Sequence, residues 1–577
     1  ISNAFKYTPK EKNIIVKVTE NEKIIKNVLQ LVALLRAHGI RRAVLCPGSR
    51  NVPLVQAFAT CEDFECFSVT DERSAGFFAV GLALHVQAPV VVCCTSGSAL
   101  LNLHPAVCEA FYRRVPLVVV SADRPAAWIG QMDGQTLPQP GVFGGLVRKA
   151  VNLPEVRTGE DEWYANRLVN EALLEVDHHG YGPVHINVPL SEPLFQFTAE
   201  ALPSVRRMVR RDMSDEGRTL SFFLKEELPK YRRVLVVSGQ MSSDEAAGVA
   251  ACLSGSRVAW LAEVLGNCPS ASDAVRGFDA LLYAAREEDL QALRPDLVIT
   301  VGGHVVSKRL KQFLRRTPSL VHWHVSPDGL PADLFCALTT VVEASPADFF
   351  RLFFRPEALL SGAYAQLWHE SCARLASPET GYSEMYAVRR VLEALPPHAV
   401  LHLANSSVVR LAELCRLPEG VEVQCNRGVN GIEGSVSAAV GYAAVSDRMN
   451  FLLVGDLSFF YDMNALWNGH IRSNLRIVVL NNGGGAIFHA LPGLDMAGDT
   501  RHFVTASHGA SAAGWAESQG FTYLQATDTV SLLAAFDDLL DETATAPVLL
   551  EVFTDAEADA EELRNYYHAI KERWKNF

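Results

Sequence analysis

Val454-Gly455-Asp456-Leu457-Ser458 and Leu480-Asn481-Asn482-Gly483-Gly484-Gly485 each end a short hydrophobic run in a polar turn. Such a run, bounded by Gly, Asn or Asp, is typical of a buried strand. In an open parallel sheet the carboxyl ends of the strands share one edge, where ligands bind. We therefore expect the two turns to face the same site at the edge of an open parallel sheet.

The two turns predict a clamp for a divalent cation and a diphosphate. Asp456 and Asn482 offer the oxygen ligands that Mg²⁺ prefers, and Mn²⁺ could replace it. The glycine run allows close approach of the backbone, so a carbonyl of Gly484 is expected as a third ligand. Gly-Asp and Asn-Gly are also common turn dipeptides, and either one alone would indicate only a turn. The spacing of 26 residues, from 456 to 482, favours the clamp.

Short hydrophobic strands alternating with helical segments continue along the chain, which indicates parallel sheets with crossover helices. Helical spacing from Ile24 stops at Gly39, and a charged stretch at 203–218 marks a linker. A chain of 577 residues exceeds what one core usually supports. We expect three doubly wound α/β domains, at 22–202, 219–355 and 380–577. The predicted strands are 43–46, 67–70, 90–94, 117–120, 233–237, 258–261, 296–301, 320–325, 400–403, 421–425, 451–454, 476–480 and 548–553.

Composition excludes several classes of protein. The net charge of −13 disfavours a general nucleic-acid binder. No hydrophobic run approaches the roughly 18 to 20 residues that span a bilayer, and the N-terminus lacks the regions of a signal peptide. Ser2-Asn3-Ala4 resembles part of an expression tag, so the first 20 or so residues are left out of the fold. The 12 cysteines show no CxxC or zinc spacing, which favours reduced thiols in a cytoplasm.

Glu72 is a candidate site residue in the first domain. It lies at a predicted strand-to-helix junction, where Asp71 is a plausible N-cap. A glutamate in the first turn of a helix often only stabilises the helix through its dipole, by about 0.3 to 1 kcal/mol. Here it falls between the turns Cys46-Pro47-Gly48-Ser49-Arg50-Asn51 and Thr95-Ser96-Gly97-Ser98-Ala99, which also follow strands. Three such turns are expected to outline one pocket.

The GD-x25-NN arrangement resembles the diphosphate motif of thiamine-diphosphate enzymes. Leu457 departs from the glycine usual at that position, but the synthases of menaquinone biosynthesis look like this sequence, with GDLS. The resemblance runs from about residue 24 to near the C-terminus. It implies a pyrimidine domain, a mainly structural middle domain and a diphosphate domain, in that order. It also implies that Glu72 hydrogen-bonds the cofactor pyrimidine, while Ile432 holds the cofactor in its bent shape.

Two anionic substrates require several fixed cations, preferably guanidinium groups. Each candidate taken singly is more often a surface charge, and the Gly302-Gly303 turn beside two of them lacks a dinucleotide fingerprint. In the resembling synthases, the matching segments bind the carboxylates of 2-oxoglutarate and isochorismate. The substrate residues so implied are Ser49, Arg50, Gln135, Lys308, Arg309, Ser406, Arg410, Arg427, Ile487, Phe488 and Leu491.

The same resemblance implies the remaining site residues and the reaction. Gln135 joins Glu72 near the reacting centre, and loss of CO₂ from 2-oxoglutarate leaves a succinyl carbanion that adds to isochorismate. Glu72 and the clamp come from different subunits in that family, which implies a homodimer or homotetramer with active sites at the subunit interface. The cofactor residues implied are Glu72, Ser406, Gly431, Ile432, Gly455, Asp456, Leu457, Ser458, Asn482, Gly484, Ile487 and Phe488.

Two other functions stay open on the sequence. An acetolactate-synthase-like or simple 2-oxo acid decarboxylase would use a small neutral acceptor and would not need so many dispersed cations. A non-catalytic scaffold of the same fold could bind an anionic effector through them. The presence of Glu72, Asp456 and Asn482 together favours the enzyme.

Overall fold

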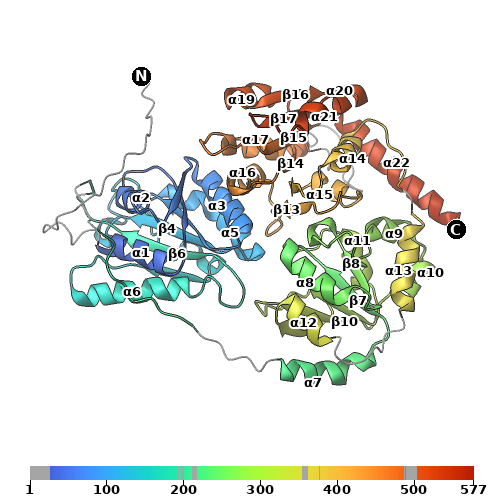
Figure 1. Cartoon of the computed structure of the whole chain (residues 1–577), viewed down its shortest axis with the longest axis horizontal. Coiled ribbons are helices and arrows are strands. Elements are labelled where there is room, and N and C mark those ends of the chain that lie inside the picture. Colours follow the sequence, from blue (N-terminus) through green and yellow to red (C-terminus); the bar gives the residue numbers. More distant parts are fainter. Residues whose placement is uncertain are drawn as a thin grey trace.

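The computed structural model describes residues 26–192, 194–195, 201–210, 217–353, 362–375, 377–485, 488 and 503–576. Three sheets form within this part of the chain, and every strand pair in them is parallel. Figure 1 shows them as three bodies, the N-terminal one in blue, the middle one in green and the C-terminal one in orange to red. The predicted class, α/β with three doubly wound parallel sheets, is confirmed. The predicted domain limits enclose one sheet each and stay a prediction.

The N-terminal sheet has the strand order β2-β1-β3-β4-β6-β5. Its central strands β3 and β4 are buried along their whole length, because helices cover both faces. Its strands are β1 (Arg42–Leu45), β2 (Glu65–Ser68), β3 (Val90–Cys94), β4 (Leu117–Asp123), β5 (Lys149–Asn152) and β6 (Val184–Pro189). Its helices are α1 (Lys26–Ala37), α2 (Val52–Ala59), α3 (Glu72–Val86), α4 (Ser98–Asn102), α5 (His104–Arg113), η2 (Ala126–Trp128), η3 (Gly144–Leu146) and α6 (Gly159–Leu173).

The middle sheet has five strands in the order β11-β10-β9-β7-β8 among the described residues. Its strands are β7 (Val234–Ser238), β8 (Ala259–Ala262), β9 (Leu297–Val301), β10 (Val321–Ser326) and β11 (Leu338–Glu343). Its helices are α7 (Arg218–Glu227), η4 (Leu228–Lys230), α8 (Ser243–Leu253), η5 (Val264–Gly266), α9 (Phe278–Ala284), α10 (Glu287–Leu293), α11 (Lys308–Arg315), α12 (Pro346–Phe353) and α13 (Ala363–Ala373).

The C-terminal sheet, β13-β12-β14-β15-β17-β16, repeats the strand order of the N-terminal sheet position by position. Its strands are β12 (Val400–Leu403), β13 (Glu422–Cys425), β14 (Asn450–Gly455), β15 (Leu475–Asn481), β16 (Thr522–Ala526) and β17 (Val548–Phe553). Its helices are α14 (Glu384–Ala394), α15 (Ser407–Ala412), α16 (Ser435–Val445), α17 (Asp456–Tyr461), η6 (Met463–Leu466), α19 (Ala513–Ser518), α20 (Thr529–Ala534), α21 (Phe536–Leu539) and α22 (Ala556–Lys575).

Helices α3 and α16 hold the two outer domains together, and Figure 1 shows them facing each other. Glycines allow the two backbones to touch. A Cβ at Gly81 would lie 2.0 Å from the carbonyl oxygen of Ala438, and one at Gly441 would lie 2.1 Å from that of Phe78. Only glycine fits at such a distance. The packing therefore depends on these two residues.

The middle domain is tied to the C-terminal domain by polar contacts at strand ends. Gln240 Nε2 donates to the carbonyl oxygen of Cys425 at 2.8 Å, and Asn267 Oδ1 accepts from the backbone N–H of Val423 at 2.7 Å. At the far end of the interface, the indole N–H of Trp574 donates to Asp289 at 3.0 Å. None of the helices described is both long enough and apolar enough to span a bilayer.

Candidate active site

The two turns that the sequence predicts as a clamp meet at the carboxyl ends of β14 and β15. Asp456 is buried at the start of α17. Its Oδ1 accepts a hydrogen bond from the backbone N–H of Leu457 at 2.6 Å, and its Oδ2 accepts one from Gly484 at 2.9 Å. Burial raises the pKa of Asp456, while these donors and the nearby His508 lower it. Two turns distant in the sequence thus meet at one carboxylate.

Asn482 supplies the second oxygen. Its Nδ2 donates to Oδ2 of Asp559 at 3.4 Å, whereas its Oδ1 is buried and has no hydrogen-bond partner among the described residues. A buried polar atom without a partner is unfavourable unless a ligand satisfies it. The oxygen chemistry of Asp456 and Asn482 therefore fits a hard divalent cation.

The glycine turn leaves no room for side chains. Gly484 has φ of +150°, and a Cβ there would lie 2.7 Å from the carbonyl oxygen of Thr505. The backbone N–H of Gly485 donates to that same oxygen at 2.7 Å, which fixes the turn. A backbone without side chains beside the oxygens of Asp456 and Asn482 suits a diphosphate and its metal ion.

Segments that follow three neighbouring strands converge beside the clamp. Asn405, after β12, donates through Nδ2 to the carbonyl oxygen of Gly431 at 2.7 Å. The hydroxyl of Ser458, after β14, donates to the carbonyl oxygen of Ile432. The structure thus brings together the expected cofactor residues Ser406, Gly431, Ile432, Gly455, Asp456, Leu457, Ser458, Asn482 and Gly484.

The N-terminal domain brings its own turns together. A Cβ at Gly48 would lie 2.3 Å from Cβ of Thr95, and one at Gly97 would lie 3.1 Å from the backbone of Gln135. Glu72, the first residue of α3, accepts a hydrogen bond from Nδ2 of Asn102 at 3.1 Å. Ser49 lies in the first of these turns and is exposed. The turns at Gly48 and Thr95 and the segment at Gln135 therefore lie close together on this domain, and the pocket that the three turns should outline stays a prediction.

Gln139 is a buried residue of this half that the sequence did not single out. Its Oε1 accepts from the backbone N–H of Gly97 at 2.8 Å. Its Nε2 donates to the carbonyl oxygen of Ala122 at 3.0 Å and to Oδ1 of Asn187 at 2.8 Å. Gln139 thereby fastens the segment that carries Gln135, while Gln135 itself is exposed and has φ of +56°.

The two halves touch within the chain, but not through Glu72. The guanidinium of Arg73 donates to the carbonyl oxygen of Tyr461 at 2.6 Å and lies over its ring, and Asn464 donates to Asp71 at 2.9 Å. Tyr461 ends α17, whereas the clamp residue Asp456 begins it. Within the part of the chain that the structure describes, no hydrogen bond joins Glu72 to the clamp.

Two of the expected substrate cations lie together beside the converging segments. Arg410 donates to the carbonyl oxygen of Ser406 at 2.7 Å, and Arg427 donates to Oδ1 of Asn405 at 2.8 Å. Burial lowers the pKa of Arg410, and the positive charge of Arg427 lowers it further. The buried Nε of Arg427 has no partner within the described ranges. This pair therefore has unsatisfied positive charge to offer an anion.

The other expected cations differ in their surroundings. Arg50 is buried and forms an ion pair with Glu192 at 3.0 Å. Arg309 pairs with Asp279 and donates to the hydroxyl of Tyr567 at 3.0 Å. Lys308, at the start of α11, is exposed. Arg50 and Arg309 are thus already paired with carboxylates, whereas no described contact engages Lys308.

Two further cations were missed because no motif marks them. Arg124 begins the segment after β4, where it donates to the carbonyl oxygen of Gly134 at 3.1 Å and pairs with Asp133. Burial and then the charge of Arg124 lower the pKa of Arg50. Lys311 in α11 is half-buried, and burial lowers its pKa. Arg124 lies next to Gln135, which the sequence did predict.

The apolar wall expected after the glycine run is only partly described. Ile487 and Leu491 lie outside the described residues. Phe488 is half-buried, and its backbone N–H donates to the carbonyl oxygen of Gly485 at 3.1 Å. Phe488 therefore follows the clamp turn directly.

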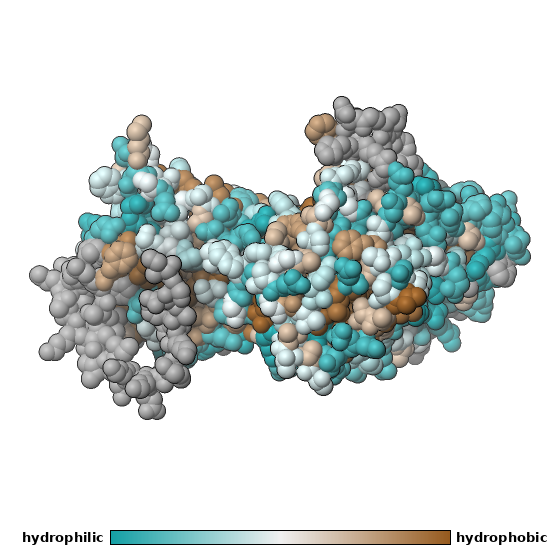
Figure 2. Space-filling view, turned by 90° about the horizontal axis from the view of Figure 1, so that it is seen from above, coloured by the Kyte–Doolittle hydropathy of each residue, from teal (hydrophilic) through white to brown (hydrophobic). Residues whose placement is uncertain are grey.

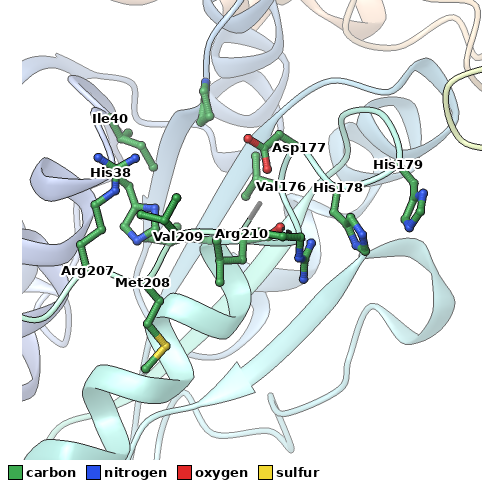
Figure 3. Close-up of a pocket in the computed structure, with 13 residues that line it drawn as sticks. His38, Ile40, Val176, Asp177, His178, His179, Arg207, Met208, Val209 and Arg210 are labelled. Atoms are coloured by element: carbon green, nitrogen blue, oxygen red, sulfur yellow. Dashed lines mark hydrogen bonds between the residues drawn. The ribbon is translucent and has the colours of Figure 1, made fainter. Parts of the chain in front are cut away.

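A cavity of about 260 Å³ lies elsewhere, and Figure 3 shows its lining. His38 and Pro89 line it, and both precede strands of the N-terminal sheet, so the cavity lies at the amino ends of these strands. Arg210, from the segment that leaves the domain, is paired there with Glu175 at 2.6 Å. The cavity is thus remote from the polar turns at the carboxyl ends.

Family comparisons agree with the geometry of both halves. Residues 27–142 match the thiamine pyrophosphate enzyme N-terminal TPP binding domain, and residues 406–552 match the corresponding C-terminal TPP binding domain. These matches cover Glu72 in one half and Asp456 and Asn482 in the other. The fold and the site define a thiamine pyrophosphate enzyme, and the predicted cofactor, thiamine diphosphate, is the same compound.

Similar proteins identify a narrower family within the thiamine pyrophosphate enzymes. A protein of Bacteroides fragilis named 2-succinyl-5-enolpyruvyl-6-hydroxy-3-cyclohexene-1-carboxylate synthase is 56% identical over 555 residues, which cover 95% of this chain and 99% of the relative. Proteins of the same name from Bacteroides thetaiotaomicron and Phocaeicola vulgatus are 54% and 53% identical, with the same coverage. The chain belongs to the 2-succinyl-5-enolpyruvyl-6-hydroxy-3-cyclohexene-1-carboxylate synthase family, as its motifs predicted.

Proposed function

We propose that this chain decarboxylates 2-oxoglutarate with thiamine diphosphate and transfers the succinyl unit to isochorismate by 1,4-addition. The product is 2-succinyl-5-enolpyruvyl-6-hydroxy-3-cyclohexene-1-carboxylate, a step of menaquinone biosynthesis, and the enzyme is a transferase. The name shared by the relatives supports this reaction. The observation that carries it in the structure is the pair of oxygens beside the Gly484 turn, from Asp456 and from Oδ1 of Asn482, which has no partner among the residues described.

The clamp residues would hold Mg²⁺, or Mn²⁺, and with it the diphosphate of the cofactor. When bound, thiamine diphosphate supplies an electron sink for the pair of electrons that loss of CO₂ releases. Asp456 and Asn482 contribute side-chain oxygens, and Gly484 contributes a backbone carbonyl. Burial of Asp456 excludes water from the metal site, which strengthens its interaction with the cation.

Glu72 would hold the proton shared with the pyrimidine ring of the cofactor, and Ile432 would support the ring from below. Ile432 is 38% exposed in this chain, so its side chain is available for such a contact. The close approach of Gly97 to Gln135, and the hydrogen bond from Asn102 in the helix after Gly97 to Glu72, support a shared site for these residues. Gln135 would then orient the reacting carbonyl by hydrogen bonding.

The cations would receive the substrate carboxylates. Arg410 and Arg427 are side by side, and the unpartnered Nε of Arg427 supports a direct contact with an anion. Lys308, which is exposed, would add a mobile charge from the middle domain. Arg50 and Arg309 already have carboxylate partners, so a substrate carboxylate would share or replace Glu192 and Asp279.

We further propose that two chains assemble so that Glu72 of one meets the clamp of the other. Within one chain the Glu72 carboxylate turns to Asn102, which supports this arrangement. Exposed apolar side chains also stand on the segments that carry the two half-sites, and these are Leu101, Trp128, Met132, Val429, Ile432 and Trp467. Figure 2 shows scattered hydrophobic groups among hydrophilic ones on the face seen from above. A cytoplasmic location is part of the proposal, and the twelve free cysteines support it.

The test uses Glu72→Gln, with Glu62→Gln at an exposed position as the matched control. We expect Glu72→Gln to keep Mg²⁺-dependent binding of thiamine diphosphate, because the clamp is untouched. Product formation from 2-oxoglutarate and isochorismate should fall by about 10²- to 10⁴-fold, the usual contribution of a positioned acid or base. The control should retain full activity.

Three results would contradict the proposal in different ways. Full activity of Glu72→Gln would remove Glu72 from the reaction. Turnover of pyruvate but not of 2-oxoglutarate would favour an acetolactate-synthase-like or decarboxylase activity. Absence of Mg²⁺-dependent thiamine diphosphate binding by calorimetry would favour a non-catalytic scaffold.

A further inference from the structure

A buried carboxylate behind the clamp links three separate segments. Asp559 lies in the first turns of α22 and is 7% exposed. Its Oδ1 accepts from the backbone N–H of Glu384 at 2.7 Å. Its Oδ2 accepts from the hydroxyl of Thr554 at 2.7 Å and from Nδ2 of Asn482 at 3.4 Å. Asp559 thus connects α22, the start of α14 and the clamp turn.

Helix capping accounts for only one oxygen of Asp559. The N-cap of α22 is Asp555, which accepts from the backbone N–H groups of Glu557 and Ala558. The N-cap of α14 is Ser383, which accepts from Tyr386. Burying a carboxylate is costly unless hydrogen bonds or a cation compensate it. Ser383 leaves the backbone N–H of Glu384 free, and Oδ1 of Asp559 accepts from it, so capping explains that oxygen but not Oδ2, which accepts from Thr554 and Asn482.

An amide group has two ends of opposite chemistry, and Asp559 can bind only one of them. An ionised carboxylate accepts hydrogen bonds and donates none, so it binds the NH₂ end of Asn482 and repels the oxygen end. The Oδ1 of Asn482 is then directed away from Asp559 and has no partner in the described part of the chain. With the nitrogen engaged, this oxygen is the atom left for a cation.

We infer that Asp559 is a positioning residue that fixes the amide of Asn482 with its oxygen toward the metal ion. The inference rests on the proposed Mg²⁺ clamp and assigns Asp559 no contact with the metal, cofactor or substrate. Carboxylates that orient metal ligands in this way typically contribute 10- to 100-fold to metal affinity. Through Glu384, the same carboxylate also reaches the segment that carries Ser406. The side chain of Glu384 accepts a hydrogen bond at 2.5 Å from the hydroxyl of Ser407, which follows Ser406 in the sequence.

Exchanging the amide and the carboxylate gives a test that depends on the direction of the hydrogen bond. In Asp559→Asn, the new amide can still accept from Glu384 through its oxygen, but its NH₂ group faces the NH₂ group of Asn482. Asn482 must turn over or lose its partner, so the metal loses an oxygen ligand. Asn482→Asp alone places two carboxylates together. The double variant Asn482→Asp with Asp559→Asn restores one donor, one acceptor and one free oxygen for the metal.

We therefore expect Asp559→Asn to have opposite effects in the two backgrounds. In the wild-type background it should weaken the Mg²⁺ dependence of thiamine diphosphate binding about 10- to 100-fold. In the Asn482→Asp background, Asp559→Asn should strengthen the Mg²⁺-dependent binding of thiamine diphosphate. Calorimetry of thiamine diphosphate binding over a series of Mg²⁺ concentrations measures both effects on the full chain. Circular dichroism and thermal unfolding of the cofactor-free variants show whether each one folds.

Thr554→Val is the matched control, because it removes a hydrogen bond to Asp559 without changing any charge or Asn482. Its Mg²⁺ affinity should stay within about threefold of wild type. Equal Mg²⁺ affinity of wild type and Asp559→Asn would overturn the inference. If Asp559→Asn does not fold, the two Asn482→Asp variants decide, and failure of the double variant to bind better than Asn482→Asp overturns it. A wild-type chain without Mg²⁺-dependent binding would instead contradict the proposed function.

Discussion

The backbone N–H of Gly484 donates a hydrogen bond to Oδ2 of Asp456 at 2.9 Å, which joins two turns that end neighbouring strands. The other oxygen of Asp456 accepts from its neighbour Leu457 at 2.6 Å. Both partners of the Asp456 side chain are backbone N–H donors, so only a side chain with two acceptor oxygens satisfies both of them. The charge of Asp456 thus builds the clamp before any metal ion binds.

Asp456→Asn should abolish this arrangement, because its NH₂ group must oppose one of the two N–H donors. A lost hydrogen bond to a charged group costs about 1.5 to 3 kcal/mol, and the proposed metal site would also lose a carboxylate oxygen. We expect Mg²⁺-dependent thiamine diphosphate binding to weaken by at least about 100-fold, as measured by calorimetry. Asp447→Asn, at a side chain that is 98% exposed, is the control and should bind normally. Unchanged binding by Asp456→Asn would remove Asp456 from the clamp.

Gln139→Leu should separate catalysis from cofactor binding. The substitution leaves the N–H of Gly97 without its buried partner, at a cost of about 1 to 3 kcal/mol of stability, and removes one of the two donors to Oδ1 of Asn187. The segment that carries Gln135 loses its attachment, so kcat for CO₂ release should fall while Mg²⁺ and cofactor affinity stay near wild type. Gln131→Leu, at an exposed position of the same segment, is the control. A lower Tm with unchanged kcat would restrict Gln139 to a structural role.

Gly81→Ala and Gly441→Ala should loosen the contact between α3 and α16. Each new methyl group would meet a carbonyl oxygen at about 2 Å, so the helices must move apart. Overpacking of this kind typically costs about 1 to 3 kcal/mol. We expect a lower Tm and faster proteolysis between the outer domains. Gly159→Ala, where a Cβ meets nothing within 4 Å, should leave both measurements unchanged.

The sequence predicted the buried strands well, because burial on both faces leaves an uninterrupted hydrophobic run. Val90–Cys94 was predicted with its observed bounds, and the clamp followed from the turns after such strands. Some strands with polar positions were missed. In β6 (Val184–Pro189), the side chains of His185 and Asn187 are buried and hydrogen-bonded to Ser121. No local sequence pattern predicts these contacts. The edge strand Glu65–Ser68 was predicted two residues late, since only Phe67 of it is buried.

The candidate site was predictable where a residue follows a strand and carries its chemistry in a motif. Asp559 has no such signal, because its partner Asn482 is 77 residues away and an acidic residue early in a helix is ordinary. Arg309 was predicted as a substrate cation without its neighbours, and only the structure brings Asp279 to it. Side-chain partners from distant segments decide which cations are free, and a single sequence does not contain them.

Asp462 should make the stability of the protein depend on pH. Its two oxygens accept from the backbone N–H and the hydroxyl of Ser437, both at 2.7 Å, and tie α17 to the start of α16. Burial raises the pKa of Asp462 to about 6, although these hydrogen bonds and the charge of Arg73 oppose the shift. A carboxyl group whose pKa is higher in the folded than in the unfolded state binds its proton more tightly when folded.

The stabilisation from protonated Asp462 is therefore complete below 3.8, the ordinary pKa of an aspartate in the unfolded chain, and is lost as the pH rises through about 6. Asp462→Asn keeps an acceptor for the N–H of Ser437 and offers its NH₂ group to the hydroxyl, without titrating. The free energy of unfolding of wild type relative to Asp462→Asn should fall between about pH 4.5 and pH 7, as measured by urea unfolding of the cofactor-free chain. If the two proteins instead give parallel pH profiles over this range, the carboxyl group of Asp462 does not titrate with the raised pKa.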